Sequence, residues 1–150
     1  MRRALALALE NVRRGWGGPF GALVVRQGAW LAEGVNSVTR LCDPTAHAEM
    51  VAIRGACLAL GSFRLDGCIL YTSCEPCPMC LGAIYWARLS AVFYAGGHAD
   101  AAQAGFDDSF IYRQFDVRAG ERAIPMRQIL HDESRAPLEE WQRSTTKVPY

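Results

Sequence analysis

The sequence has almost no excess charge of either sign, because 16 Lys and Arg residues are balanced by 15 Asp and Glu residues. A formal net charge of +1 provides little of the positive field that captures a phosphate backbone. A basic C-terminal arm is missing too, since acidic residues outnumber basic ones between residues 131 and 150. A nucleic-acid partner is therefore not expected.

Long apolar runs are also missing. No stretch approaches the roughly 18 apolar residues that a membrane-spanning helix needs, so no membrane partner is expected. Residues 1–9 resemble the basic and apolar regions of a signal peptide, but Glu10 ends the apolar run. We expect an N-terminal helix that stops at Gly15, and a cytoplasmic protein.

The length and composition fit one globular domain. A chain of 150 residues, 51% hydrophobic and 21% charged, has no disordered or fibrous signature. Internal repeats and low-complexity linkers are absent. We therefore interpret residues 1–150 as a single domain.

The spacing of apolar residues predicts strands and helices that alternate along the chain. Strands are expected at residues 20–26, 30–38, 68–72, 91–95 and 124–130. Besides the N-terminal helix that stops at Gly15, helices are expected near residues 46–60, 76–88 and 137–144. Residues 106–112 are expected in a loop-rich region. Parallel strands need crossover helices of this length, so residues 46–95 predict an α/β layer fold. The hairpin formed by the first two strands makes the sheet mixed.

Three of the six cysteines, Cys74, Cys77 and Cys80, follow one another at steps of three. In a reducing cytoplasm this spacing favours metal or redox chemistry over structural disulfides. The run begins like an iron–sulfur motif, but its fourth position, residue 84, is Ile. We interpret Cys74 as a residue near the site, with replacement of one ligand as the alternative. The other three, Cys42, Cys57 and Cys68, are expected to be buried.

Two short motifs sit where helices are expected to begin. His47-Ala48-Glu49 starts one helix, and Pro76-Cys77-Pro78-Met79-Cys80 starts another. His-x-Glu followed by Pro-Cys-x-x-Cys is the signature of the zinc deaminases. One imidazole and two thiolates supply three tetrahedral ligands and leave a fourth place for water, as in catalytic sites. We predict that His47, Cys77 and Cys80 hold one zinc ion per chain.

Glu49 is the predicted catalytic residue. Zinc lowers the pKa of bound water from 15.7 to about 7, and the released proton needs an acceptor. Glu49 lies two residues from His47, where its side chain can reach the water without binding the metal and can then protonate the ring nitrogen and, in a second transfer, the departing amine. The motifs thus predict hydrolytic deamination of a heterocycle. The non-enzymatic alternative is a structural zinc or iron–sulfur module.

Four segments resemble the small bacterial guanine deaminases, and the resemblance extends over nearly the whole chain. They are residues 17–22, 43–49, 70–88 (LYTSCEPCPMCLGAIYWAR) and 104–112 (AGFDDSFIY). The first three are shared in outline with tRNA adenosine deaminases, whereas the last is specific. The resemblance implies a three-layer α-β-α cytidine-deaminase-like fold with a central mixed five-stranded sheet, and hydrolysis of guanine to xanthine and ammonia in purine catabolism.

The same resemblance implies how a purine base is bound. Asn36 and Asp108 are expected to hydrogen-bond the base, while Phe20 and Trp86 help to enclose it. Guanine presents N–H donors on its Watson–Crick edge, which a carboxylate such as Asp108 accepts. The ordinary alternatives are core aromatics for Phe20 and Trp86, and a solvated loop charge or a helix cap for Asp108.

Guanine deaminases of this family pair as homodimers in which the C-terminal segment crosses to cover the neighbouring site. Residues 131–150 are expected to be that segment, and Tyr150 to enter the partner's base pocket. Residues 147–149 (Lys-Val-Pro) depart from the Lys-Glu-Tyr ending of the family. The alternative for Tyr150 is a frayed chain end.

Other substrates remain open at the level of the motifs. A tRNA adenosine deaminase would need a basic surface that binds an extruded base, which the near-neutral charge disfavours. A deaminase of another base or nucleoside would leave residues 104–112 unexplained. Aminated triazines share the amidine group of guanine and stay possible as additional substrates.

Overall fold

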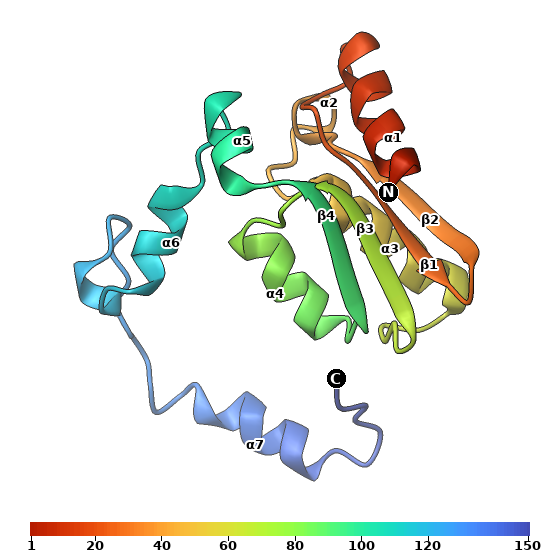
Figure 1. Cartoon of the computed structure of the whole chain (residues 1–150). Helices are drawn as coiled ribbons and strands as arrows, with labels where there is room; N and C mark the ends of the chain where they lie inside the picture. Colours follow the sequence, from red (N-terminus) through yellow and green to blue (C-terminus); the bar gives the residue numbers. More distant parts are fainter. The chain divides into compact units, whose positions relative to one another are not determined.

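The computed structural model describes residues 1–150, which divide into two compact units, residues 1–108 and residues 109–150. The first unit contains, in order, α1 (Arg2–Arg13), β1 (Gly21–Arg26), β2 (Ala29–Val35), α2 (Val38–Leu41), α3 (Ala48–Leu60), β3 (Cys68–Cys74), α4 (Pro78–Trp86), β4 (Ala91–Gly96) and α5 (His98–Gln103) (Figure 1). The second contains α6 (Ser109–Phe115), a 3-10 turn (Ala119–Glu121) and α7 (Arg135–Arg143). None of the helices is long and apolar enough to cross a bilayer.

The first unit is built on a mixed sheet with the strand order β2-β1-β3-β4. β1 runs antiparallel to β2 and β3, and β4 runs parallel to β3. The expected α/β class and mixed sheet are confirmed, but the expectation of five strands is wrong. The predicted fifth strand, residues 124–130, is irregular. Pro125 has no N–H to donate to a ladder, and apolar residues form a strand only where a neighbouring strand pairs with them.

Helices cover both faces of the sheet, which gives the three expected layers. Side chains alternate between the two faces of a strand. At Gly21 on β1 a Cβ atom would collide with Ala4 of α1, whereas Ala22 and Val24 belong to a buried cluster with Ala52 of α3. In Figure 1, accordingly, α1 lies over one face of the sheet and α3 behind the other.

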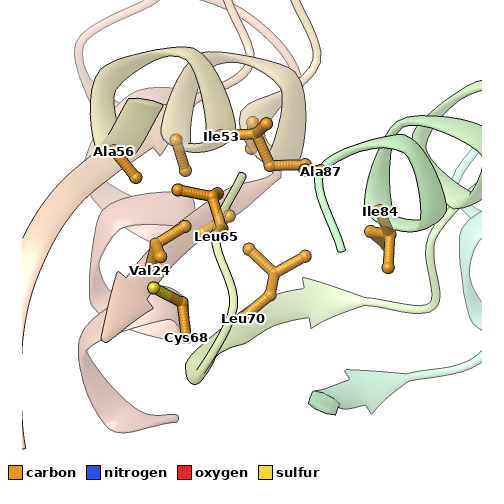
Figure 2. Close-up of a cluster of buried hydrophobic side chains, with 11 residues drawn as sticks. Val24, Ile53, Ala56, Leu65, Cys68, Leu70, Ile84 and Ala87 are labelled. Carbon is orange, nitrogen blue, oxygen red and sulfur yellow. The ribbon is translucent and has the colours of Figure 1, made fainter. Parts of the chain in front are cut away.

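The main core lies between the sheet and the face that carries α3 and α4. Figure 2 shows Val24 and Leu70 from the sheet in one cluster with Ile53 of α3 and Ile84 of α4, with Leu65 between Val24 and Ile53. α3 comes so close to β2 that a Cβ atom on Gly34 would overlap the backbone of α3. The contact involves Ala48 and Ala52 in the first turns of α3, so it helps to position the end of the helix that follows His47.

Local sequence signals located most elements correctly. The β1–β2 turn has positive φ values at Gln27 and Gly28, and Gly61 ends α3 in the left-handed conformation. The short helices α2, α5 and α6 were not expected, and α6 occupies part of a region predicted to be loop-rich. Cys68 is buried as expected and Cys57 is half-buried, but Cys42 is exposed where α2 ends.

Candidate metal and active site

The two halves of the zinc motif each stand at the start of a helix. His47 is the residue before α3, with extended backbone angles, and Cys77 occupies the same position before α4. Pro78 follows at the first position of α4, where its missing N–H costs no intrahelical hydrogen bond. Cys80 lies in the first turn of α4 and therefore near Cys77. β3 leads directly into α4, and α3 and α4 pack on the same core. The first turns of the two helices therefore lie close together.

The spacing of the three predicted ligands fits a zinc ion. His47 Nδ1 lies 3.5 Å from Cys77 Sγ and 3.7 Å from Cys80 Sγ, and all three ligand atoms lie within 4.8 Å of one another. Zn–N bonds of about 2.0–2.1 Å and Zn–S bonds of about 2.3 Å at tetrahedral angles put nitrogen and sulfur about 3.6 Å apart. The observed N–S distances agree with the edges of such a tetrahedron.

The charge states of the two thiols are linked. Hydrogen bonds from Cys80 and His47 lower the pKa of the Cys77 thiol to about 4. The same contact with Cys77, together with burial, raises the pKa of Cys80, so the pair retains one proton. The hydrogen bond to Cys77 also raises the pKa of His47. A divalent cation bound by both sulfurs would displace the retained proton.

Glu49 lies beside the ligands and is almost completely buried, with 5% of its surface exposed. Thr72 on β3 donates a hydrogen bond from Oγ1 to Glu49 Oε1 at 3.0 Å, and Cys80 Sγ lies 3.5 Å from Oε2. Burial raises the pKa of Glu49, while the hydrogen bond from Thr72 acts in the opposite direction. A raised pKa makes a carboxylate a better proton acceptor.

Asn36 follows β2 and is 7% exposed, so its amide orientation is set by neighbouring groups. Its Oδ1 accepts long hydrogen bonds from the backbone N–H groups of Gly18 and Val38, at 3.3 and 3.4 Å. The amide Nδ2 is therefore the end available as a donor to a ligand. Asn11 of α1 holds this segment by donating Nδ2 to the carbonyl oxygens of Gly18 and Asn36, both at 2.8 Å.

Phe20 and Asp108 come together through the segment that precedes Asp108. The rings of Phe20 and Phe106 meet edge to face, with centroids 4.9 Å apart. Asp108 is close enough to His47 to contribute to the raised pKa of that ring. The structure thus brings Phe20, Asn36 and Asp108 to the same side of the molecule as the zinc motif.

The side chains of Trp86 and Tyr150 are both exposed. Trp86 is 65% exposed and lines a surface hollow on α4 together with Gly82, Tyr85 and Arg88. Tyr150 belongs to the second unit and is 71% exposed. The roles assigned to these two residues stay predictions.

Comparisons with known proteins agree with this geometry. The family model described as "Cytidine and deoxycytidylate deaminase zinc-binding region" matches residues 1–96. The chain belongs to this deaminase family. It is 59% identical to the guanine deaminase of Bacillus subtilis (strain 168), over 100% of this chain and 96% of that protein. The X-ray structure of guanine deaminase from Bacillus subtilis matches with a TM-score of 0.97 and 60% identity, covering 99% of this chain and 95% of the other.

A second group of deaminases is more distant. The tRNA-specific adenosine deaminase of Aquifex aeolicus (strain VF5) is 42% identical over 94 residues, which is 61% of this chain and 62% of that protein. The similarity to the Bacillus subtilis protein over the whole chain confirms the predicted membership among the bacterial guanine deaminases. It disfavours the alternative of a structural zinc or iron–sulfur module.

Cys74 and Thr72 show where sequence reasoning about this deaminase was incomplete. Cys74 ends β3 and turns its sulfur toward the carbonyl oxygen of Gly97, 3.7 Å away, so it is not one of the three clustered ligands. Thr72 belongs to a strand that the sequence predicts only as apolar, yet its hydroxyl contacts Glu49. The signal was a polar residue within a strand expected to be covered on both faces, because buried polar groups need partners.

Proposed function

We propose that this protein is a zinc-dependent guanine deaminase that converts guanine and water into xanthine and ammonia. The observation that carries the proposal is the similarity to the Bacillus subtilis guanine deaminase along the whole chain. The spacing of His47, Cys77 and Cys80 supports the cofactor, because it suits one zinc ion per chain. Guanine then loses its exocyclic amine at C2, where water adds.

The chemistry divides between the cofactor and Glu49. A zinc ion held by the three ligands supplies Lewis acidity that makes water a nucleophile at neutral pH. Glu49 accepts one proton of the attacking water and delivers it to the ring nitrogen. It then takes the remaining proton from the new hydroxyl group at C2 and delivers it to the amine, which leaves as ammonia. The contact with Thr72 holds Oε1 in place, and Oε2, which lies on the side of the zinc ligand Cys80, carries the proton.

The base is recognised by one donor and one acceptor. The Nδ2 of Asn36 donates to an acceptor on the purine, because its Oδ1 accepts hydrogen bonds from Gly18 and Val38. The carboxylate of Asp108 accepts from the N–H donors of the Watson–Crick edge. Phe20 packs against one side of the base. An adenine edge presents a different order of donors and acceptors and fits this pair less well.

We further infer a homodimer whose C-terminal segments, residues 131–150, are exchanged. α4 is apolar on every side, and Leu81 and Tyr85 on its outer face are 41% and 76% exposed, as expected for a helix that another chain covers. In this arrangement Trp86 and the partner-supplied Tyr150 would complete the enclosure of the base. A cytoplasmic location, in purine catabolism, suits a site that depends on reduced thiolates.

The proposal is tested by ammonia release from the purified, zinc-loaded protein. The substrates are guanine, guanosine, adenine, cytosine, cytidine, an aminated triazine and a tRNA anticodon stem-loop. Release from guanine, with little or none from the other natural substrates, is expected. Release from the stem-loop alone would instead identify a tRNA adenosine deaminase.

Glu49→Gln separates catalysis from metal binding. This variant keeps the size of the side chain but removes the group that accepts the proton. We expect it to retain about one zinc ion per chain and to lose at least about 100-fold in kcat, the scale of general acid–base catalysis. Unchanged turnover would exclude Glu49 as the proton carrier.

A further inference from the structure

His98, the first residue of α5, lies between two carboxylates. Its Nδ1 is 3.4 Å from Asp108 Oδ1, and its Nε2 is 3.4 Å from Glu75 Oε1. All three side chains are half-buried, with 34%, 20% and 33% of the His98, Asp108 and Glu75 side chains exposed. Either ring nitrogen of an imidazole can carry a hydrogen and donate it to a carboxylate, and each nitrogen of His98 faces one carboxylate oxygen. Neither His98 nor Glu75 has a part in the chemistry described above.

The backbone fixes the Glu75 end of this bridge. β3 and β4 run parallel, with Cys74 paired to Gly96, and the N–H of Glu75 donates to the carbonyl oxygen of Gly96 at 2.8 Å. Asp100 caps the start of α5 by accepting from the N–H of Gly97 at 2.8 Å. His98 is therefore attached to the end of the sheet from which the chain continues to Cys77 and the first turn of α4.

On the other side of His98, Asp108 is not part of a strand or helix. It lies on an irregular segment that follows α5. Phe106 anchors that segment through its ring contact with Phe20 and through its N–H, which donates to the carbonyl oxygen of Ala101 at 2.9 Å. These contacts fix the backbone near Asp108 but leave the rotation of its carboxylate free. The contact of Asp108 Oδ1 with His98 Nδ1 restrains that rotation.

We propose that His98 is a positioning residue for base recognition, holding Asp108 Oδ1 so that Oδ2 is presented to the purine, while Glu75 holds the other side of the imidazole ring. This inference rests on the proposed function, because it gives a reason for the orientation of the acceptor that guanine requires. One carboxylate, that of Glu75, orients the imidazole ring, and the ring in turn orients the second carboxylate, that of Asp108. His98 does not touch the reacting atoms.

Two substitutions at His98 show which ring nitrogen is needed for binding of the base, Nδ1 or Nε2. In His98→Asn the amide nitrogen takes the place of Nδ1 and can still reach Asp108, whereas in His98→Gln it takes the place of Nε2 and reaches Glu75. We would measure binding of 8-azaguanine, a guanine analogue, to zinc-loaded protein carrying Glu49→Gln, which prevents turnover. We expect His98→Asn to bind within about threefold of the parent, and His98→Gln and His98→Ala to bind at least about tenfold more weakly.

A double-mutant cycle tests whether His98 acts through Asp108. Once Asp108→Asn is present, His98→Ala is expected to cause no further loss of binding. Arg64→Ala, which removes an exposed ion pair with Asp66 before the start of β3, is the matched control and should leave binding unchanged. Equal losses in His98→Asn and His98→Gln, or fully additive effects with Asp108→Asn, would overturn the positioning role.

Ammonia release by the otherwise unaltered protein keeps this test separate from the proposed function. If guanine is not deaminated, the proposed function fails. If guanine is deaminated and the His98 variants do not follow the expected order, only the role of His98 fails.

Discussion

Thr72 donates a hydrogen bond from its hydroxyl to Glu49 Oε1 at 3.0 Å, and the contact joins the middle of the sheet to the first turn of α3. Thr72 is fully buried and Glu49 nearly so. The hydroxyl restrains a carboxylate whose position relative to the zinc ligands decides whether a proton can be transferred. A strand residue outside both zinc motifs is thus part of the site.

Thr72→Val should therefore lower activity without removing the metal. Valine has the same shape but no hydroxyl, and a hydrogen bond to a charged group contributes about 1.5–3 kcal/mol. We expect kcat for guanine to fall by at least about tenfold, with zinc content unchanged. Thr72→Ser, which keeps the donor, should retain most of the activity, and equal activity in the two variants would contradict the role of the hydroxyl.

Zinc content should distinguish Cys80 from Cys74. Cys80→Ser removes a sulfur that lies 3.7 Å from His47 Nδ1, and we expect most of the zinc to be lost during purification. Cys74→Ser alters a thiol that faces the carbonyl oxygen of Gly97, so about one zinc ion per chain should remain. Metal analysis of the two proteins is the measurement. Loss of zinc from Cys74→Ser would instead indicate that Cys74 is a zinc ligand.

The ion pair between Arg3 and Glu33 should make stability depend on pH at the acid end. Two contacts of 2.7 and 2.6 Å attach α1 to β2 and lower the pKa of Glu33 below its usual 4.5. A lowered folded-state pKa stabilises the protein above the unfolded value, and this contribution disappears as pH falls through the folded value. Partly exposed pairs of this kind contribute up to about 1 kcal/mol.

Glu33→Gln tests this pH dependence by thermal unfolding. The variant should melt below the parent at pH 7, and the difference should shrink as the pH falls below about 4. Asp66→Asn, which removes a fully exposed ion pair with Arg64, serves as the control and should have a smaller effect at neutral pH. A difference in melting temperature that stays constant from pH 7 to pH 3 would rule out ionisation of Glu33 as its origin.

Gly34 is the position where a single methyl group should be most disruptive. A Cβ atom there would overlap the carbonyl oxygen of Ala48 and the backbone nitrogen of Ala52, so α3 would have to move away from β2. Overpacking of this kind costs about 1–3 kcal/mol. We expect Gly34→Ala to lower the free energy of unfolding by that amount and to weaken zinc binding, because α3 begins beside His47. Gly120→Ala meets no atom within 4 Å and should leave both unchanged.

The sequence could predict what depends on neighbours along the chain. Gly61 ends α3, Pro78 begins α4 and alternating apolar residues mark β1 and β2, because turns, helix ends and strand faces are set within a few residues. The same reasoning gave a wrong prediction for residues 124–130, which do not form a strand. Their apolar character suggested a strand, but a strand exists only when another one pairs with it.

By itself, the sequence determined the chemistry of the metal site, since the zinc ligands and Glu49 lie in two short motifs whose residue types and spacing suit catalytic zinc. Only the tertiary structure decided which groups orient them. Thr72 reaches Glu49 across 23 positions, and Glu75 and His98 meet across the same number. Such contacts depend on strand register and on how closely a helix approaches the sheet. These are properties of the packed fold, which no local pattern of residues encodes.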